Sequence, residues 1–297
     1  MNYSEEELEE LSYNELQSVA KQENIKATGK EEEILLRLKD EIEGSGSGSK
    51  LGDIKENIES ELNQKENQKT DVERLNTGVE GLDEILNGGI PDKNLVLVSG
   101  GPGSGKTTLG LQFLLEGIKN GETGIYVNLD ERKDKIIRNA ELFGWDLEKH
   151  EENDDLHFVR PSVFDFKKAK REIDQTASRF DAERIVIDSL SVLGSAVQSE
   201  SKMRRGIMEL NQRFNRLEAT TLSISEVEGD NISRYGVEEY AVDGIIRLYN
   251  TRKGRSFQRG MAIKKMRGSD HSNKLHPLEI GEDGVITYPD QKVFRDM

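Results

Sequence analysis

Residues 100–107 read G-G-P-G-S-G-K-T, and they stand between an apolar run that ends at Val98 and another that begins at Leu109. A strand that delivers a glycine-rich loop to the start of a helix directs backbone N–H groups, and the positive end of the helix, at one point. Such a point binds nucleotide phosphates. The alternative, a flexible glycine-rich turn, gives no reason for the lysine and threonine that close the motif. The segment therefore predicts a strand, a phosphate-binding loop and a helix in succession.

Each side chain of this loop has an expected task. Lys106 is expected to reach the β- and γ-phosphates, and Thr107 to offer its hydroxyl to Mg²⁺, which prefers oxygen ligands. The residues expected to contact the nucleotide are Gly100, Gly101, Pro102, Gly103, Ser104, Gly105, Lys106, Thr107 and Thr108.

Length and composition limit the possible classes of protein. The chain has 297 residues, enough for one large domain and a small appendage. It has no cysteine, which excludes disulfides and thiolate metal sites and favours a reducing compartment inside the cell. Apolar runs are strand-sized and the amino terminus is acidic, so we expect no membrane span and a cytoplasmic location. The net charge of −15 disfavours nonspecific binding of the whole surface to DNA or anionic lipid, although a local basic patch could bind either.

A Gly-Ser-Gly-Ser-Gly-Ser run at residues 44–49 marks the main domain boundary, because such a run buries no apolar area. A natural linker and an engineered joint are both compatible with so regular a repeat. The stretch 50–70 carries one narrow apolar stripe, so we expect a linker with a short solvated helix over 44–71. The predicted division is a small module at 1–43, this linker, a main domain at 72–290 and a tail at 291–297.

From residue 72 onward, strand-sized apolar runs alternate with segments of helical periodicity. Strands are predicted at 94–99, 124–129, 156–159, 184–188 and 220–225, and helices at 106–120, 133–143, 167–180 and 202–217. This alternation is typical of an α/β fold with a mainly parallel central sheet and helices on both faces. After residue 234 only strands are predicted, at 244–249, 260–266 and 278–288, as an antiparallel extension of the sheet.

Acidic side chains are expected at the sheet edge where the loop lies. Asp188 ends an apolar run, so its carboxylate should reach that edge and hold Mg²⁺; alternatively it caps the next turn. Asp130 and Glu131 follow another strand at the same edge. Successive strand residues point to opposite faces, so we assign Glu131 as the base that activates water and Asp130 as an auxiliary. Alternatively, both acids start the following helix.

Seven cations and no acid occur from Arg252 to Arg267, so this stretch is positively charged in a chain whose net charge is negative. Alternation along a strand places Lys265 and Arg267 on one face, as a pair able to hold phosphate oxygens. The alternative is a solvated basic strand.

Three segments together resemble the KaiC-type branch of the RecA superfamily of ATPases, whose plan archaeal RadA-like recombinase paralogues share. They are residues 77–91 (TGVEGLDEILNGGIP), 139–147 (NAELFGWDL), and 234–240 (RYGVEEY) with 265–271 (KMRGSDH). The resemblance covers residues 72–289 and implies a RecA-like P-loop fold.

The resemblance also implies that ATP and Mg²⁺ bind between the subunits of a homo-oligomeric ring, commonly a hexamer. It makes Asp130 and Glu131 paired catalytic acids, and it implies that Lys265 and Arg267 contact the γ-phosphate bound by a neighbouring subunit. Residues 225–226 fall where the superfamily senses that phosphate. Circadian KaiC has two such domains and this sequence has one, so clock function and autokinase activity are not implied.

The amino-terminal segments 11–30 and 34–38 resemble a SAP module, two short helices around a glycine-containing turn. Such modules often bind DNA. Residues 1–43 contain thirteen acidic and five basic residues, and DNA affinity depends on phosphate contacts. We therefore expect this module to contact a protein partner more readily than DNA.

Three functions follow from these features. The leading hypothesis is a ring-forming regulatory or signalling ATPase that hydrolyses ATP. The second is an ATP-dependent DNA-binding accessory factor of recombination or repair, favoured by the SAP-like segment, the cations at 252–267, and Lys202, Arg204 and Arg205. The third is a nucleotide-gated scaffold with little hydrolysis.

Overall fold

A computed structural model describes residues 16, 19–20, 34–35, 38, 72–162, 165–195, 197, 199–227, 229 and 231–291. The chain divides into two compact units, residues 1–71 and 72–297. In the first unit the six described residues are helical, and five of them are buried: Leu16, Val19, Ala20, Ile34 and Leu38. The other residues of the segments predicted to form a SAP-like module and a linker, and the predicted tail beyond its first residue, lie outside the described residues.

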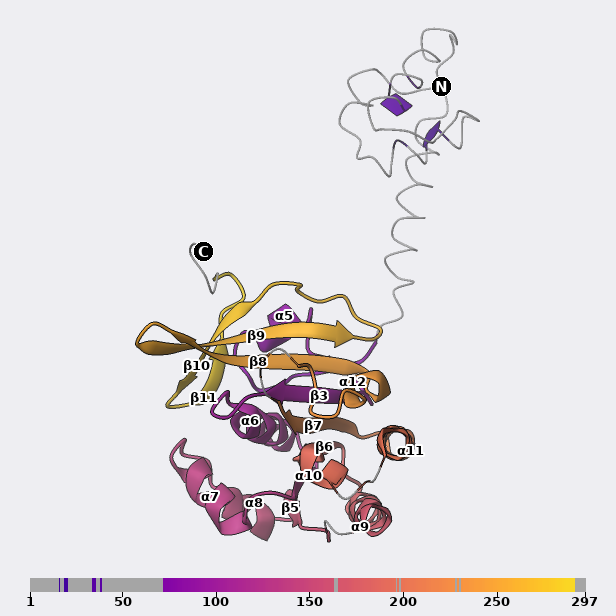
Figure 1. Cartoon of the computed structure of the whole chain (residues 1–297), viewed down its shortest axis with the longest axis vertical. Coiled ribbons are helices and arrows are strands. Elements are labelled where there is room, and N and C mark those ends of the chain that lie inside the picture. Colours follow the sequence, from indigo (N-terminus) through magenta and orange to yellow (C-terminus); the bar gives the residue numbers. More distant parts are fainter. Residues whose placement is uncertain are drawn as a thin grey trace. The chain divides into compact units, whose positions relative to one another are not determined.

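The second unit is built on a nine-stranded sheet in the order β11-β10-β9-β8-β3-β7-β6-β4-β5 (Figure 1). Its strands are β3 (Leu95–Gly100), β4 (Gly124–Asn128), β5 (Leu156–Val159), β6 (Arg184–Asp188), β7 (Thr220–Glu226), β8 (Gly244–Lys253), β9 (Ser256–Met266), β10 (His276–Gly281) and β11 (Gly284–Thr287). Strands β3 to β8 pair in parallel, and β8 to β11 pair antiparallel. The predicted α/β fold is therefore confirmed.

Alternate residues of the central strands bury two separate cores. In β3, Val96 and Val98 join the core on one face of the sheet, and Leu95 and Leu97 join the core on the other. Both faces of β3 are therefore buried, which explains why its sequence is continuously apolar rather than alternating.

Helices cover both faces. The first core is covered by α6 (Lys106–Lys119), α7 (Lys133–Glu141), α8 (Leu147–Glu152) and the short α5 (Leu82–Ile85). The second core is covered by α9 (Phe166–Arg179), α10 (Leu190–Ser195), α11 (Glu200–Arg216) and the short α12 (Glu238–Ala241). Figure 1 shows α6, α7 and α8 grouped apart from α9 and α11. Within the described ranges, no helix is long and apolar enough to cross a membrane.

The structure corrects the sequence prediction in four respects. The single strand predicted at 278–288 is two antiparallel strands, β10 and β11. Strand β8 runs parallel to β3, so the antiparallel part of the sheet begins only at β9. The helices α5, α8, α10 and α12 and the strand pair β1 (Arg74–Leu75) and β2 (Ile90–Pro91) were not predicted, because elements this short carry little periodicity. Helix α11 begins two residues earlier than predicted, because the Ser199 hydroxyl accepts a hydrogen bond from the Lys202 amide and caps it.

Candidate functional site

The segment after β3 has the loop geometry that its glycines favour. Gly103 and Gly105 have φ angles of 69° and 99°, in the left-handed region that residues with a Cβ rarely adopt. A Cβ at Gly100 would lie 2.4 Å from the Ser104 hydroxyl oxygen. Helix α6 begins at Lys106, so its free N–H groups open onto this loop. The strand, loop and helix thus form the cradle that the motif predicts.

Lys106 is buried at the start of α6, and its Nζ donates a hydrogen bond to the Gly101 carbonyl oxygen at 3.0 Å. Burial lowers the pKa of Lys106, whereas the charges of Glu226 and Asp188 oppose that shift. The next residue, Thr107, donates its hydroxyl to Asp188 Oδ2 at 2.8 Å. The structure therefore brings together the two residues predicted to hold Mg²⁺.

Asp188 has a second donor that the sequence analysis missed. The hydroxyl of Tyr126, a fully buried residue of β4, donates to Asp188 Oδ2 at 2.6 Å. Burial raises the pKa of Asp188, while the hydrogen bonds from Tyr126 and Thr107 oppose the shift. Burial and, secondarily, the charge of Asp188 raise the pKa of Tyr126 well above its usual range. The phenol therefore stays protonated and donates a hydrogen bond to Asp188.

Asp130 and Glu131 lie in the loop between β4 and α7. They precede Arg132, the N-cap residue of α7, so neither acid caps that helix. Burial is the largest cause of the raised pKa values of Asp188 and Tyr126, and the charges of Asp130 and Glu131 add smaller contributions to Asp188 and Tyr126, respectively. Glu131 Oε1 is also 2.5 Å from Lys135 Nζ, one helical turn further along. Strands β6 and β7 lie between β4 and β3 in the sheet. Asp130 and Glu131 are therefore at the same sheet edge as the phosphate loop, but the strand they follow is not a neighbour of β3.

Lys265 and Arg267 lie together at the opposite edge of the sheet. Lys265 Nζ donates to the Val242 carbonyl oxygen at 2.6 Å, and Arg267 Nη1 is 3.5 Å from Asp243 Oδ1. Asp243 in turn exchanges hydrogen bonds with Leu95, the first residue of β3, whereas the phosphate loop follows the last residue of that strand. Burial and, secondarily, the neighbouring Arg267 lower the pKa of Lys265. The whole of β3 therefore separates this basic pair from the loop of its own chain.

The seven cations of 252–267 do not form one patch, because they are spread along the hairpin of β8 and β9. Arg259, near the start of β9, donates from Nε to the Gly103 carbonyl oxygen at 2.9 Å. Its cross-strand partner, Asn250, donates to the Pro102 carbonyl oxygen at 3.2 Å. These two side chains hold the outer surface of the phosphate loop, a role that the sequence analysis did not assign to them.

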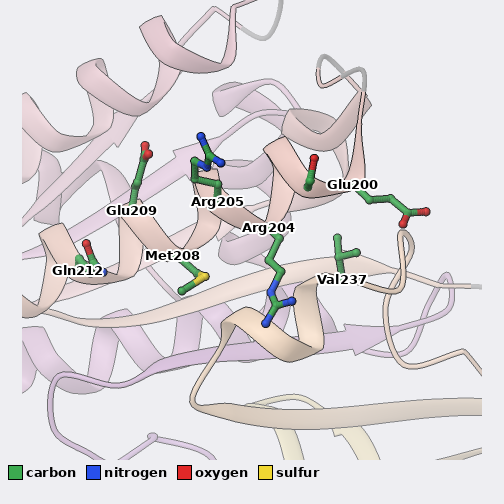
Figure 2. Close-up of a pocket in the computed structure, with 8 residues that line it drawn as sticks. Glu200, Arg204, Arg205, Met208, Glu209, Gln212 and Val237 are labelled. Atoms are coloured by element: carbon green, nitrogen blue, oxygen red, sulfur yellow. The ribbon is translucent and has the colours of Figure 1, made fainter.

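A separate groove of about 570 Å³ lies along α11 (Figure 2). Arg204 extends from the helix toward the segment that carries Val237, while Arg205 points to the other side. The groove is also lined by Glu200 and Glu209, so the cations there are interleaved with acids. This surface is mixed in charge rather than basic.

The residues of the loop fit a nucleotide with Mg²⁺. Gly100, Gly103 and Gly105 have no Cβ, so the loop can adopt its close-packed, left-handed backbone conformation. The backbone N–H groups of such a loop can surround phosphate oxygens. The Thr107 hydroxyl and the Asp188 carboxylate are the hard oxygen ligands that Mg²⁺ prefers. Thr108 is half-buried in the first turn of α6. No group of three or more His, Cys, Asp or Glu residues in the part of the chain that the structure describes could hold a metal ion.

The fold and this loop define a RecA-like P-loop nucleotide-binding protein. The sequence model described as "ATPase: KaiC" matches residues 75–292, and the chain belongs to this family. A KaiC-like protein of Pyrococcus horikoshii has a similar crystal structure, with 36% identity and a TM-score of 0.68 over 73% of this chain and 100% of that one.

Two relatives show the range of the family. A UPF0273 protein of Thermotoga maritima is 34% identical over 74% of this chain and 98% of its own length. The circadian clock oscillator protein KaiC of Prochlorococcus marinus is also 34% identical, but the similarity covers only 46% of that longer protein.

Proposed function

We propose that this chain binds ATP with Mg²⁺ and hydrolyses it, and that a neighbouring copy in a homo-oligomeric ring completes each site. The separation of two phosphate-binding groups carries this proposal. The loop at 100–107 lies at one end of β3, and Lys265 with Arg267 lies at the other. A second copy, placed head to tail, unites the two groups in one site.

Each group has a role in this scheme. Lys106 and the N–H groups of the loop hold the phosphates, and Thr107 and Asp188 hold Mg²⁺, which neutralises phosphate charge. Glu131 accepts the proton of the attacking water. Arg267 of the neighbouring copy supplies positive charge to the transition state, because its side chain is 62% exposed and can reach outward.

Complementation between two inactive variants tests the intersubunit site. Lys106→Ala removes the phosphate contact, and Arg267→Ala removes the charge supplied to the neighbour. In a mixture, an interface works when an Arg267→Ala copy supplies the loop and a Lys106→Ala copy supplies the arginine. Random mixing in equal amounts should therefore restore about a quarter of wild-type turnover. The molar mass in the presence of ATP is measured by light scattering. A stable monomer that turns over ATP briskly would contradict the ring.

Glu131→Gln separates hydrolysis from binding. The variant should bind ATP and assemble but lose turnover, because an amide does not accept the proton of the water. If the wild-type protein itself assembles with ATP and scarcely hydrolyses it, the chain is a nucleotide-gated scaffold instead.

A regulatory role through a protein partner is part of the proposal, with residues 1–43 as the contact module, 44–71 as linker, 72–290 as ATPase domain and 291–297 as tail. Its support is the excess of acids in the first segment, which opposes contact with nucleic-acid phosphates. We also propose a cytoplasmic location, based on the absence of cysteine. DNA binding that weakens with added salt would favour the accessory-factor alternative.

A further inference from the structure

Tyr126 is held by the hydrophobic core while its hydroxyl reaches the metal-ligand region. In the register of β4 and β6, Tyr126 pairs with Val186 and Asn128 pairs with Asp188. Alternation therefore places Tyr126 on the same face of the sheet as Asp188, at a level two residues closer to the amino ends of the strands. The ring packs against Phe158, with centroids 5.7 Å apart, and the residue has no exposed surface.

The two donors to Asp188 Oδ2 differ in freedom. Thr107 is half-buried at the start of α6, and its hydroxyl can rotate about a single bond toward another partner. The Tyr126 hydroxyl lies at the end of a ring that the core encloses, so its oxygen cannot move away unless the core moves. Only the tyrosine can therefore keep its hydrogen bond to Asp188 while the threonine turns to a metal ion.

We propose that Tyr126 is a positioning residue that fixes the Asp188 carboxylate for Mg²⁺. The phenol holds Oδ2, and the second carboxylate oxygen and the Thr107 hydroxyl remain for the ion and its waters. This inference rests on the proposed function, because it requires that Mg²⁺ with a nucleotide binds at this loop. Because this hydrogen bond is present with and without the ion, its removal lowers the Mg²⁺ affinity through the freedom that the carboxylate gains and must lose again on binding. The strength of one hydrogen bond to an ionised group sets the scale of that effect, about tenfold in affinity.

Tyr126→Phe removes the hydroxyl and keeps the ring. Tyr288→Phe is a matched control, because the Tyr288 hydroxyl also donates to a carboxylate, Glu279 Oε2 at 3.0 Å, on the exposed surface. The full-length proteins are titrated with Mg²⁺ in the presence of a fluorescent ATP analogue, and analogue binding is measured separately in EDTA. We expect Tyr126→Phe to raise the half-saturating Mg²⁺ concentration about tenfold, with unchanged binding in EDTA. Tyr288→Phe should change neither quantity.

The Asp188→Asn background shows whether Tyr126 acts through Asp188. Here Tyr126→Phe should have no further effect on the Mg²⁺ response, because the carboxylate that it positions is gone. An equal effect in both backgrounds, or a wild-type Mg²⁺ response in Tyr126→Phe, would overturn the inference. If the wild-type protein binds the analogue without any Mg²⁺ dependence, the proposed function itself is wrong.

A crystal structure of the wild-type protein with Mg²⁺ and a nonhydrolysable ATP analogue gives a test that needs no variant to fold. The Tyr126 hydroxyl should remain within hydrogen-bond distance of Asp188 when Thr107 contacts the ion. A Tyr126 hydroxyl turned away from Asp188 in that complex would refute the positioning role.

Discussion

Arg184 is a buried arginine beneath the phosphate-loop helix, and its partner Glu122 offers a sharp test of what holds that helix in place. The Arg184 side chain is 1% exposed and forms a two-contact ion pair with Glu122. Its Nη1 also donates to the carbonyl oxygens of Asn76 at 2.7 Å and Phe113 at 2.9 Å. Arg184 thus ties α6 to the start of β6 and to the segment between β1 and α5.

Glu122→Ala leaves the guanidinium buried without its carboxylate. Removing one partner of a buried ion pair costs about 3–5 kcal/mol. Two features favour the lower end of that range: the Glu122 side chain is 19% exposed, and Arg184 retains its two carbonyl acceptors. We therefore expect a loss of about 3 kcal/mol in the free energy of unfolding, which for a unit of this size lowers Tm by about 6–12 °C.

The fluorescence of Trp145 makes the measurement specific, since it is the one tryptophan of the chain and lies in the second unit. Urea unfolding followed by this signal reports the ATPase unit without the amino-terminal unit. The matched control is Glu218→Ala, which breaks the exposed Lys93–Glu218 pair and should leave the midpoint near that of the wild type. A Glu122→Ala variant within about 1 kcal/mol of the wild type would show that the carbonyl contacts suffice for Arg184 and that the reasoning is wrong.

Three further predictions concern the site. Burial raises the pKa of Asp188, so the ionised carboxylate lowers the stability of the fold as the pH rises through that raised pKa. Asp188→Asn should therefore increase Tm at pH 7 without Mg²⁺ and reduce, without abolishing, the added stabilisation by Mg²⁺ and ATP. A lower Tm in thermal-shift assays would contradict this. Gly100→Ala places a Cβ 2.4 Å from Ser104 Oγ, so it should lower the free energy of unfolding by about 1–3 kcal/mol and abolish nucleotide binding. Gly281→Ala is the control, because the nearest atom to its Cβ is 4.0 Å away, and it should be neutral in the same unfolding and binding assays. Lys135→Ala breaks an exposed pair and should change turnover by less than about fivefold, so a complete loss like that of Glu131→Gln would make Lys135 part of the catalytic machinery.

Local sequence patterns were sufficient for the phosphate loop and for the central strands. The predicted strands at 156–159 and 184–188 have the observed bounds, because each is a short, mainly apolar segment flanked by polar residues. Helix ends depended on single capping contacts such as that of Ser199, and these shifted the predicted starts by one or two residues.

The contacts between distant strands could not be read in the same way. Alternation shows that Tyr126 shares a face with Asn128, but its contact with Asp188 also requires that β4 and β6 be neighbours. Likewise, the contact of Arg259 with Gly103 depends on the register of the hairpin and on its place beside β3. Strand order and register arise from packing of the whole sheet, so no local pattern specifies them.

The direction of β8 decides whether the basic pair can serve its own phosphate loop. Had β8 begun an antiparallel extension, as predicted, it would have run against β3, and β9 would have run with it. The end of β9, with Lys265 beside Arg267, would then lie at the loop edge of the same chain. Because β8 instead pairs in parallel with β3, β9 runs back and delivers both cations to the opposite edge. A single pairing between β3 and β8 therefore separates the basic pair from the phosphate loop of its own chain, and this separation supports the proposal that a second copy completes the site.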